Sequence, residues 1–466
     1  MEKKRDLTKG PIVQTLIRLA LPIMGTSFIQ MAYNLTDMMW IGKIGSHAVA
    51  AVGTAGFFTW LAMAFITISK IGVEIKVAQT TGAKRLDETK LYVRSAIQLN
   101  LCLAVIYMFV LLLLKEPLIG FFNLGDQEII NMSYTYLDVM AYGMIFYFIN
   151  PVLTAIFNGS GNSKTPFIIN TIGLLFNIVF DPILILGFGP IPALGVLGAA
   201  LATVGAQVIV TTCFIVIMIR SHISYLKLDW LKKPDIASIL AICKLGLPGA
   251  IQSGSFTLIS MVLGRFVAFY GAVPIAVQKV GSQIESISWM TAGGFSTALG
   301  AFVGQNYGAG AYHRIQKGYR TTLMLALSVG VLATLLLVFV GKPIFAFFLA
   351  EPEAIEQGAD YLKILGYSQL FMCIEITTQG LFNGLGRTYI PSIVSITLTA
   401  ARIPLAYFIA APNLLGINGI WWAISLSSVA KGILLVGIYF YLQKRHKLYP
   451  TNSLISDKNT DLASES

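Results

Sequence analysis

Residues 157–166 read FNGSGNSKTP and residues 382–391 read FNGLGRTYIP, so one pattern occurs twice at an offset of 225 positions. Toward the start of the chain, Pro22 and Pro248 each follow a leucine at an offset of 226. Further on, an LGxxG pattern also occurs twice, at an offset of 221. Offsets that hold this closely over most of the chain indicate an internal duplication.

The composition identifies the environment in which the two copies fold. Of 466 residues, 56% are hydrophobic and only 12% are charged, whereas an ordinary soluble domain has about 25% charged residues. A soluble protein of this composition could not cover its surface. The same figures exclude a disordered chain and a disulfide scaffold, so the sequence predicts a polytopic membrane protein.

Long apolar runs bounded by charge, Gly or Pro predict twelve membrane-spanning helices. Their approximate ranges are 14–41, 48–72, 89–114, 129–156, 165–187, 195–219, 237–269, 274–302, 316–341, 354–383, 389–411 and 419–442. The expected fold is an all-α integral membrane protein with two six-helix lobes. An even number of helices per copy gives both lobes the same orientation, as in a parallel internal repeat, which favours a carrier over a channel.

The basic residues predict the topology. Connections on one side carry 19 Lys and Arg, and the alternating connections carry three. The positive-inside rule therefore places both termini in the cytoplasm, in a multi-pass protein of the plasma (inner) membrane. We expect an N-terminal lobe at 1–219, a cytoplasmic linker at 220–236, a C-terminal lobe at 237–442 and a cytoplasmic tail at 443–466. The linker is either a surface-lying segment or a solvated loop.

Polar and charged side chains inside the predicted spans are candidates for function, because they are costly there. In the first span, Gln30, Tyr33, Asn34 and Asp37 recur at helical spacing and form one polar stripe that cannot face lipid. We expect Asp37 to belong to a cation-binding site, and Gln30, Tyr33 and Asn34 to be candidates for lining a substrate cavity.

Two later spans bring further oxygen donors to a similar depth. Asn177 and Asp181 are four residues apart on one face of the fifth helix, and Pro182 follows at once. With Asp37 and with Thr203 of the sixth helix, they lie about 6–12 Å below the outer boundary at 1.5 Å per residue. Carboxylate, amide and hydroxyl oxygens suit Na⁺, and two nearby carboxylates also suit reversible protonation.

The sequence alone does not distinguish Na⁺ from H⁺ as the ion that this site binds. It also leaves open that these residues form a polar network that only stabilises helix packing. In the second copy Asp37 corresponds to Leu263, and Asp181 corresponds to Ala406. The scaffold therefore recurs while the acidic set does not, which favours a specific function for the first copy.

The second half has charged groups of its own. Glu375 and Arg402 are expected either to pair structurally or to line the substrate cavity, and Glu285 and Lys279 could join them. Arg402 stands at the position equivalent to Asn177. Arg265 and Lys431 are expected near the membrane boundaries and are given no role.

The chain resembles the multidrug and toxin extrusion (MATE) family. The resemblance rests on Asp37, on VGQNYGAG at 303–310, on the duplicated FNGxGx[ST]xxP pattern and on NIVFDPILI at 177–185. It covers about residues 10–445. It implies twelve helices in two lobes and export of organic, mostly cationic compounds in exchange for Na⁺ or H⁺.

The resemblance also implies roles for particular residues. Asp37, Asn177, Asp181 and Thr203 correspond to the cation site of the N-terminal lobe, and would be the metal ligands if the ion is Na⁺. Where many members of the family have a glutamate in the seventh helix, this chain has Phe256. Glu375 lies on a helix where some members of the family carry an essential acid.

The expected function is cation-coupled multidrug antiport by alternating access. The expected partners are small organic cations and the lipid bilayer, with no cofactor beyond the coupling ion, no nucleic acid and a monomeric state. A flippase for a lipid-linked precursor is the alternative, with Arg265, Lys279 and Arg402 as its candidate cationic groups. An enzyme is disfavoured because neither an HExxH nor a nucleophile motif occurs.

Overall fold

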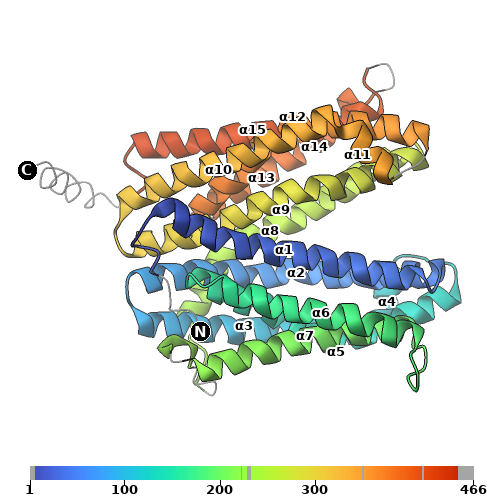
Figure 1. Cartoon of the computed structure of the whole chain (residues 1–466), viewed down its shortest axis with the longest axis horizontal. Coiled ribbons are helices and arrows are strands. Elements are labelled where there is room, and N and C mark those ends of the chain that lie inside the picture. Colours follow the sequence, from blue (N-terminus) through green and yellow to red (C-terminus); the bar gives the residue numbers. More distant parts are fainter. Residues whose placement is uncertain (1–5, 222, 228–231, 349–350, 412–413, 450–466) are drawn as a thin grey trace, which may run out of the picture. The chain divides into compact units, whose positions relative to one another are not determined.

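The computed structural model of the chain describes residues 6–221, 223–227, 232–348, 351–411 and 414–449. Residues 228–231 of the expected linker and 450–466 of the expected tail lie outside the described residues. Among the described residues every named element is helical, and the one β-bridge joins Phe188 to Ile191. The expectation of an all-α protein is confirmed for this part of the chain (Figure 1).

The chain forms two compact units, and the first comprises the described residues of Leu21–Ala250. It contains most of α1 (Ile12–Gly42), the first part of α8 (Ile236–Ala268) and the elements between them. Those elements are α2 (Ser46–Gly82), α3 (Leu86–Leu113), α4 (Lys115–Gly120), α5 (Gln127–Gly159), α6 (Lys164–Leu186), α7 (Val196–Arg220) and the short η1 (Ser224–Leu226).

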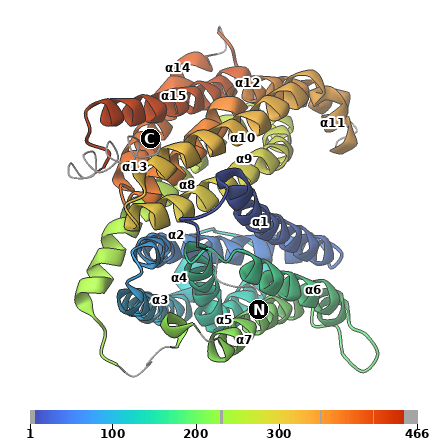
Figure 2. The same ribbon diagram turned by 60° about the vertical axis from the view of Figure 1, so that its left-hand side comes forward.

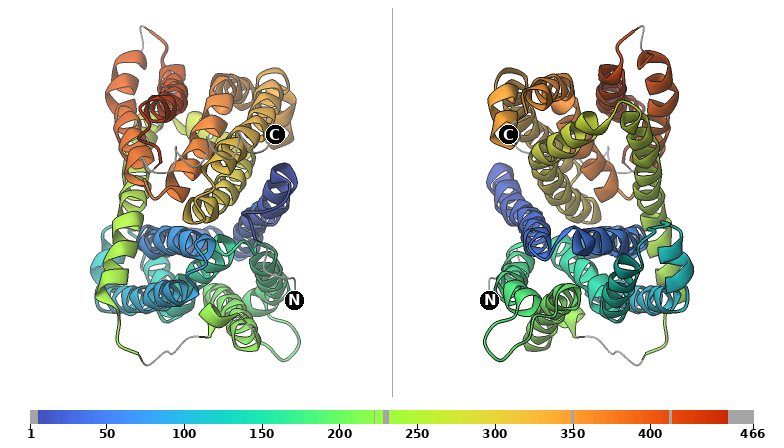
Figure 3. Two further views of the ribbon diagram at one scale, coloured as in Figure 1. Left: turned by 90° about the vertical axis from the view of Figure 1, so that its left-hand side faces the viewer. Right: turned by 90° about the vertical axis from the view of Figure 1, so that its right-hand side faces the viewer.

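The second unit comprises the described residues from Ile251 to Tyr449 together with Asp6–Ala20. After the remainder of α8 it contains α9 (Ala272–Gly308), α10 (Tyr312–Phe339), α11 (Gly341–Phe348), α12 (Pro352–Gly384), α13 (Tyr389–Ala400), α14 (Arg402–Ile409) and α15 (Ile417–Lys444). The two ranges can be followed by colour in Figures 2 and 3.

The helices of the two units correspond in order and in length. Within the described residues, α2 and α9 each have 37 residues, α3 and α10 each have 28, and α5 and α12 each have 33. The counterpart of α6 is divided into α13 and α14 at Ala401. This agreement supports the duplication that the sequence repeat indicates.

Ten helices in the described ranges are long and apolar enough to cross a membrane. The predicted spans at 274–302 and 354–383 lie on α9 and α12, which are not among the ten. Both of these helices carry buried polar side chains, including Gln369 and Glu375 on α12. The count of twelve spans therefore stays a prediction.

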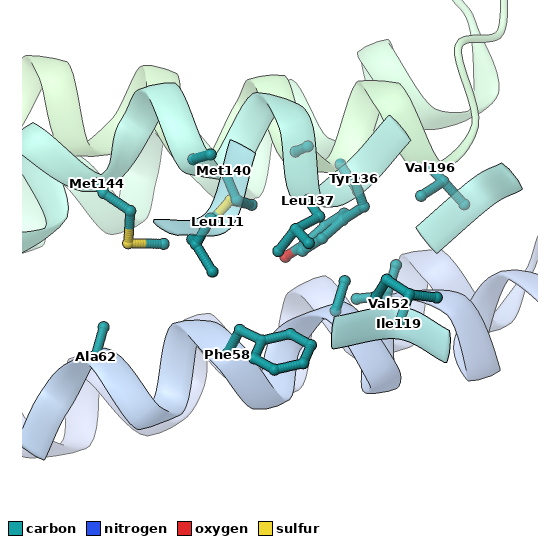
Figure 4. Close-up of a cluster of buried hydrophobic side chains, with 14 of the residues drawn as sticks. Val52, Phe58, Ala62, Leu111, Ile119, Tyr136, Leu137, Met140, Met144 and Val196 are labelled. Carbon is teal, nitrogen blue, oxygen red and sulfur yellow. The ribbon is translucent and has the colours of Figure 1, made fainter. Parts of the chain in front are cut away.

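Apolar side chains of α2, α3, α5 and α7 form the core of the first unit. Figure 4 shows Phe58 and Ala62 of α2 facing Leu137, Met140 and the other labelled residues of α4, α5 and neighbouring helices. Glycines let some of these helices approach closely. A Cβ on Gly159 of α5 would lie 2.6 Å from the carbonyl oxygen of Glu74 on α2, so a larger residue could not fit there.

Part of the predicted linker packs against the first unit. Tyr225 and Leu226 in η1 are 1% and 4% exposed and join the apolar cluster that includes Ile242. Gln98 of α3 donates a hydrogen bond of 2.9 Å to the carbonyl of Lys232. These described parts of the linker are therefore anchored, which does not fit a solvated loop, one of the two alternatives for this segment.

Candidate functional site

Three helices of the first unit carry the predicted cation-binding residues at one level. Asp37 is five residues before the end of α1, and Asp181 is five residues before the end of α6. Thr203 is seven residues after the start of α7, which runs back from the same end. At 1.5 Å per residue, each lies about 8–10 Å from its helix end. The three residues thus lie at similar distances from their helix ends, and their depth in a membrane stays a prediction.

The side chains of this set are largely buried. Asn177 and Asp181 are 0% exposed and Thr203 is 7% exposed. In the described part of the chain, four of their oxygens are buried without a hydrogen-bond partner. These atoms are Oδ1 of Asp37, Oδ1 of Asn177, Oδ2 of Asp181 and Oγ1 of Thr203. Since a buried oxygen without a partner costs about 1–3 kcal/mol, this concentration of oxygens fits a cation or a proton as the missing partner.

Two hydrogen bonds orient the set. The amide Nδ2 of Asn177 donates to Oδ1 of Asp181 over 2.8 Å, which leaves the oxygen of Asn177 available. The hydroxyl of Tyr33 donates to the backbone carbonyl of Thr203 over 3.3 Å and joins α1 to α7. The tyrosine is 9% exposed and lies close to both Asp37 and Asp181.

The chemistry of the set limits what it can hold. Asp37 and Asp181 are near enough for their charges to interact, so ionisation of both is unfavourable until a positive charge is shared between them. No group of three or more His, Cys, Asp or Glu that could hold a metal ion occurs in the described ranges. Two carboxylates with an amide and a hydroxyl suit Na⁺ or a proton better than a transition metal.

The other residues predicted for the first span divide into two groups. Tyr33 joins the buried set, as its hydrogen bond to Thr203 shows. Gln30 and Asn34 are exposed and donate or accept none of the hydrogen bonds that orient the set. Their predicted contribution to a substrate cavity stays a prediction.

The charged residues of the second unit form a separate buried set. Lys431 pairs with Glu375 over 3.0 Å and is only 6% exposed. The expectation that this lysine lies at the membrane boundary is therefore wrong. Arg402 donates hydrogen bonds to Ser427 and Ser428.

Two further residues of the second half were expected near this set. Gln369 donates a hydrogen bond of 3.4 Å to Glu285, which therefore lies in the interior of the unit. Lys279 is exposed and does not join the set. The substrate-cavity role predicted for Glu285, Glu375 and Arg402 stays a prediction.

Sequence reasoning missed one buried acid. Glu74 lies on α2, which extends to Gly82 and not to the predicted end at 72. Its Oε1 atom is buried without a hydrogen-bond partner among the described residues. The charges of Lys70, Glu74 and Lys76 end the apolar run, but their spacing of four and two residues is compatible with a continuing helix. The i, i+4 spacing of Lys70 and Glu74, at which opposite charges interact along a helix, was the signal that could have extended the predicted helix.

Comparison with known proteins adds independent information. A family model described as MatE matches residues 22–183 and 248–408, two ranges that start 226 positions apart. The chain is 28% identical over 415 residues to a probable multidrug resistance protein NorM of Thermotoga maritima, covering 88% of each chain. It is 24% identical over 464 residues to an FAD transporter of Shewanella oneidensis, covering 96% of this chain and 97% of that relative.

A solved structure has the same fold. It is described as the outward-facing conformation of a multidrug resistance MATE family transporter of the MOP superfamily. Its TM-score is 0.87 at 22% identity, with 97% of this chain and 100% of the other covered. The two matches of one family model also confirm the internal duplication.

Proposed function

The chain belongs to the MatE family, and from this premise we propose that it is a cation-coupled antiporter that exports small organic, mostly cationic amphipathic compounds. Members of the family are transporters, so the predictions of a MATE protein and of a non-enzyme are confirmed. The observation that carries the proposal is the group of four buried, unpartnered oxygens on α1, α6 and α7.

The proposed cycle follows from the charge of this group. When Asp37 and Asp181 are both ionised, they repel each other and hold their helices apart. A cation bound between them removes this repulsion and favours the closer arrangement of α1 and α6. One elementary charge that moves down a potential of ~100 mV supplies about 2.3 kcal/mol. Binding of cytosolic substrate and binding of the cation then exclude each other, so that each displaces the other, which is the basis of antiport.

The organisation in the membrane is part of the proposal. We place twelve helices in two six-helix lobes related by a parallel repeat, with both termini in the cytoplasm of the plasma membrane. The matched order of the helices in the two units supports the repeat, and the distribution of Lys and Arg supports the orientation. The protein is proposed to act as a monomer. The proposed N-terminal lobe ends at residue 219, the linker at 236 and the C-terminal lobe at 442, after which the tail begins.

One observation disfavours the alternative of a flippase for a lipid-linked precursor. Such a substrate needs free cationic groups for its pyrophosphate. Of the three candidate groups, Arg402 donates to two serines. Lys431, which was not a candidate, pairs with Glu375. The remaining candidates, Arg265 and Lys279, are exposed. The basic groups inside the second unit are thus bound to protein partners.

Dye uptake into inverted vesicles tests the proposal, with the Na⁺ and pH gradients imposed separately. A fluorescent organic cation is the main cargo, and FAD is a second cargo because one relative is an FAD transporter. Asp37→Asn should abolish ion-driven movement of the dye while the protein stays in the membrane. Asp87→Asn, at an exposed position in the first turn of α3, is the control and should transport normally.

Each outcome has a meaning for the proposal. Dye movement driven by one gradient in the wild type and lost in Asp37→Asn supports it and identifies the coupling ion. Full ion dependence in Asp37→Asn contradicts the assigned site. Movement of FAD without movement of the organic cation contradicts the proposed substrate class.

A further inference from the structure

The ion pair of Glu375 and Lys431 lies deep in the second unit. Glu375 on α12 is 5% exposed and Lys431 on α15 is 6% exposed, and Nζ lies 3.0 Å from Oε1. Ser395 on α13 donates a second hydrogen bond to the same oxygen over 3.4 Å. The carboxylate thus has a positive partner that is covalently part of the chain.

The charged groups around the Glu375–Lys431 ion pair also include both an acid and a base. Arg402, on α14, is 6% exposed and its charge acts on both Glu375 and Glu285. Tyr361 and Gln369 lie beside the carboxylate of Glu285. The four titratable groups from α9, α12, α14 and α15 are therefore two acids and two bases, and their formal charges sum to zero when all four are ionised.

The first unit differs at each equivalent position. Glu375 corresponds to Asn150, and Lys431 corresponds to Val210. Asn150 is satisfied by neutral partners, since it donates to Gln207 over 2.7 Å and accepts from Thr211 over 2.7 Å. The first unit thus combines two carboxylates with no built-in cation in its site, whereas the second unit carries its cations on its own side chains.

We propose that the ammonium of Lys431 takes the place of a coupling cation at Glu375, so that this carboxylate binds no exchangeable ion. A tethered ammonium has a very high effective concentration at its partner. A free Na⁺ or proton that displaced it would leave a buried lysine without a counter-charge, which is strongly unfavourable. This inference rests on the proposed function, and it means that Glu375 adds nothing to the ion stoichiometry to which Asp37 and Asp181 contribute.

Four variants of the full-length protein in lipid nanodiscs test this inference. Lys431→Met removes the ammonium and keeps much of the side-chain length. Lys431→Arg keeps a cation. The double variant E375Q/K431M removes both charges and is the matched control. Binding of radiolabelled Na⁺ and infrared difference spectra of carboxyl protonation are recorded for each, and Glu375→Asp identifies the band of this residue.

The wild type and Lys431→Arg should show no binding of Na⁺ or protons at Glu375. Lys431→Met should gain one cation-binding event per chain, either Na⁺ or a proton, and E375Q/K431M should lack it. The inference is overturned if Glu375 exchanges an ion in the wild type, or if Lys431→Met gains nothing beyond the double variant. If Lys431→Met does not fold, the spectra of the wild type and Lys431→Arg still show whether Glu375 exchanges an ion, and such exchange in the wild type overturns the inference.

The same measurements in an Asp37→Asn background separate this inference from the proposed function. If Lys431→Met still gains a cation-binding event when Asp37 is replaced by asparagine, the result supports the proposal that Lys431 replaces a cation at Glu375, whatever the role of Asp37. Unchanged ion binding on Asp37→Asn alone contradicts the proposed cation site and leaves the result at Glu375 valid.

Discussion

Asn177 holds Asp181 by a hydrogen bond of 2.8 Å along one turn of α6, and the amide oxygen and the second carboxylate oxygen both stay unpartnered in the described part of the chain. The amide nitrogen of Asn177 donates the one hydrogen bond of this contact. That bond fixes the positions of the amide oxygen of Asn177 and of the second carboxylate oxygen of Asp181, which can both accept from a further partner. This relationship connects the local helical spacing of the two residues with the cation site to which Asp37 and Thr203 contribute.

Replacement of Asn177 by alanine should weaken cation binding. It removes one ligand oxygen and the donor that orients Asp181, and we expect the dissociation constant to rise about tenfold, or ~1.4 kcal/mol. Asn170→Ala is the control, because the amide of Asn170 on the same helix bonds to the carbonyl of Pro166. Titration of both purified variants with the coupling ion gives the comparison. Equal affinities of the two variants for the coupling ion would contradict the assignment of Asn177 as a ligand.

The hydroxyl of Thr203 should matter more than its methyl group. Oγ1 is buried without a partner among the described residues, so Thr203→Val removes an oxygen ligand at nearly constant volume. Thr203→Ser keeps the oxygen and should transport nearly as well as the wild type. We expect Thr203→Val to need an ion concentration several-fold higher for half-maximal efflux, on the order of a lost hydrogen bond. Identical ion dependence in the two variants argues against ligation by Thr203.

The coupling cation should stabilise the folded wild type. At 100 times its dissociation constant, a ligand that binds only the folded state contributes about 2.7 kcal/mol. We expect the midpoint of thermal unfolding to rise with the coupling ion in the wild type and in Asp87→Asn. The double variant D37N/D181N should show no such rise. An equal rise in that variant would place the bound ion elsewhere.

Close packing within the first unit gives a prediction about stability. A Cβ on Gly246 of α8 would lie 1.8 Å from the carbonyl oxygen of Ile68 on α2. Gly246→Ala must therefore separate these helices, at a cost of about 1–3 kcal/mol or more. Gly437→Ala is the control, because nothing lies within 4 Å of its Cβ position. Thermal unfolding followed by size-exclusion chromatography should show a lower midpoint for Gly246→Ala only.

The repeat and the helical spacing made much of the first unit predictable. The i, i+4 relation of Asn177 and Asp181 predicted their shared face, and counting from the helix ends placed Asp37 and Thr203 at a similar level. The exposed positions of Gln30 and Asn34 were less predictable, because a polar stripe on a helix does not show which of its members face the interior.

The second unit shows where sequence reasoning fails. The position of Lys431 in an apolar run is compatible with a snorkelling side chain and with a buried one, and only the packing of α15 against α12 distinguishes them. Arg402 was the expected partner of Glu375, but the structure pairs Glu375 with Lys431 and directs Arg402 to Ser427 and Ser428. Long-range pairing of this kind depends on how helices are arranged, which periodicity does not encode.

The most direct test of the central claim is the ion flux that a substrate gradient drives in proteoliposomes. A gradient of a fluorescent organic cation should drive Na⁺ or protons in the opposite direction in the wild type and in Asp87→Asn. In Asp37→Asn the ion flux should disappear, although the variant is inserted to the same extent. A substrate-driven ion flux of wild-type size in Asp37→Asn would contradict coupling through this carboxylate.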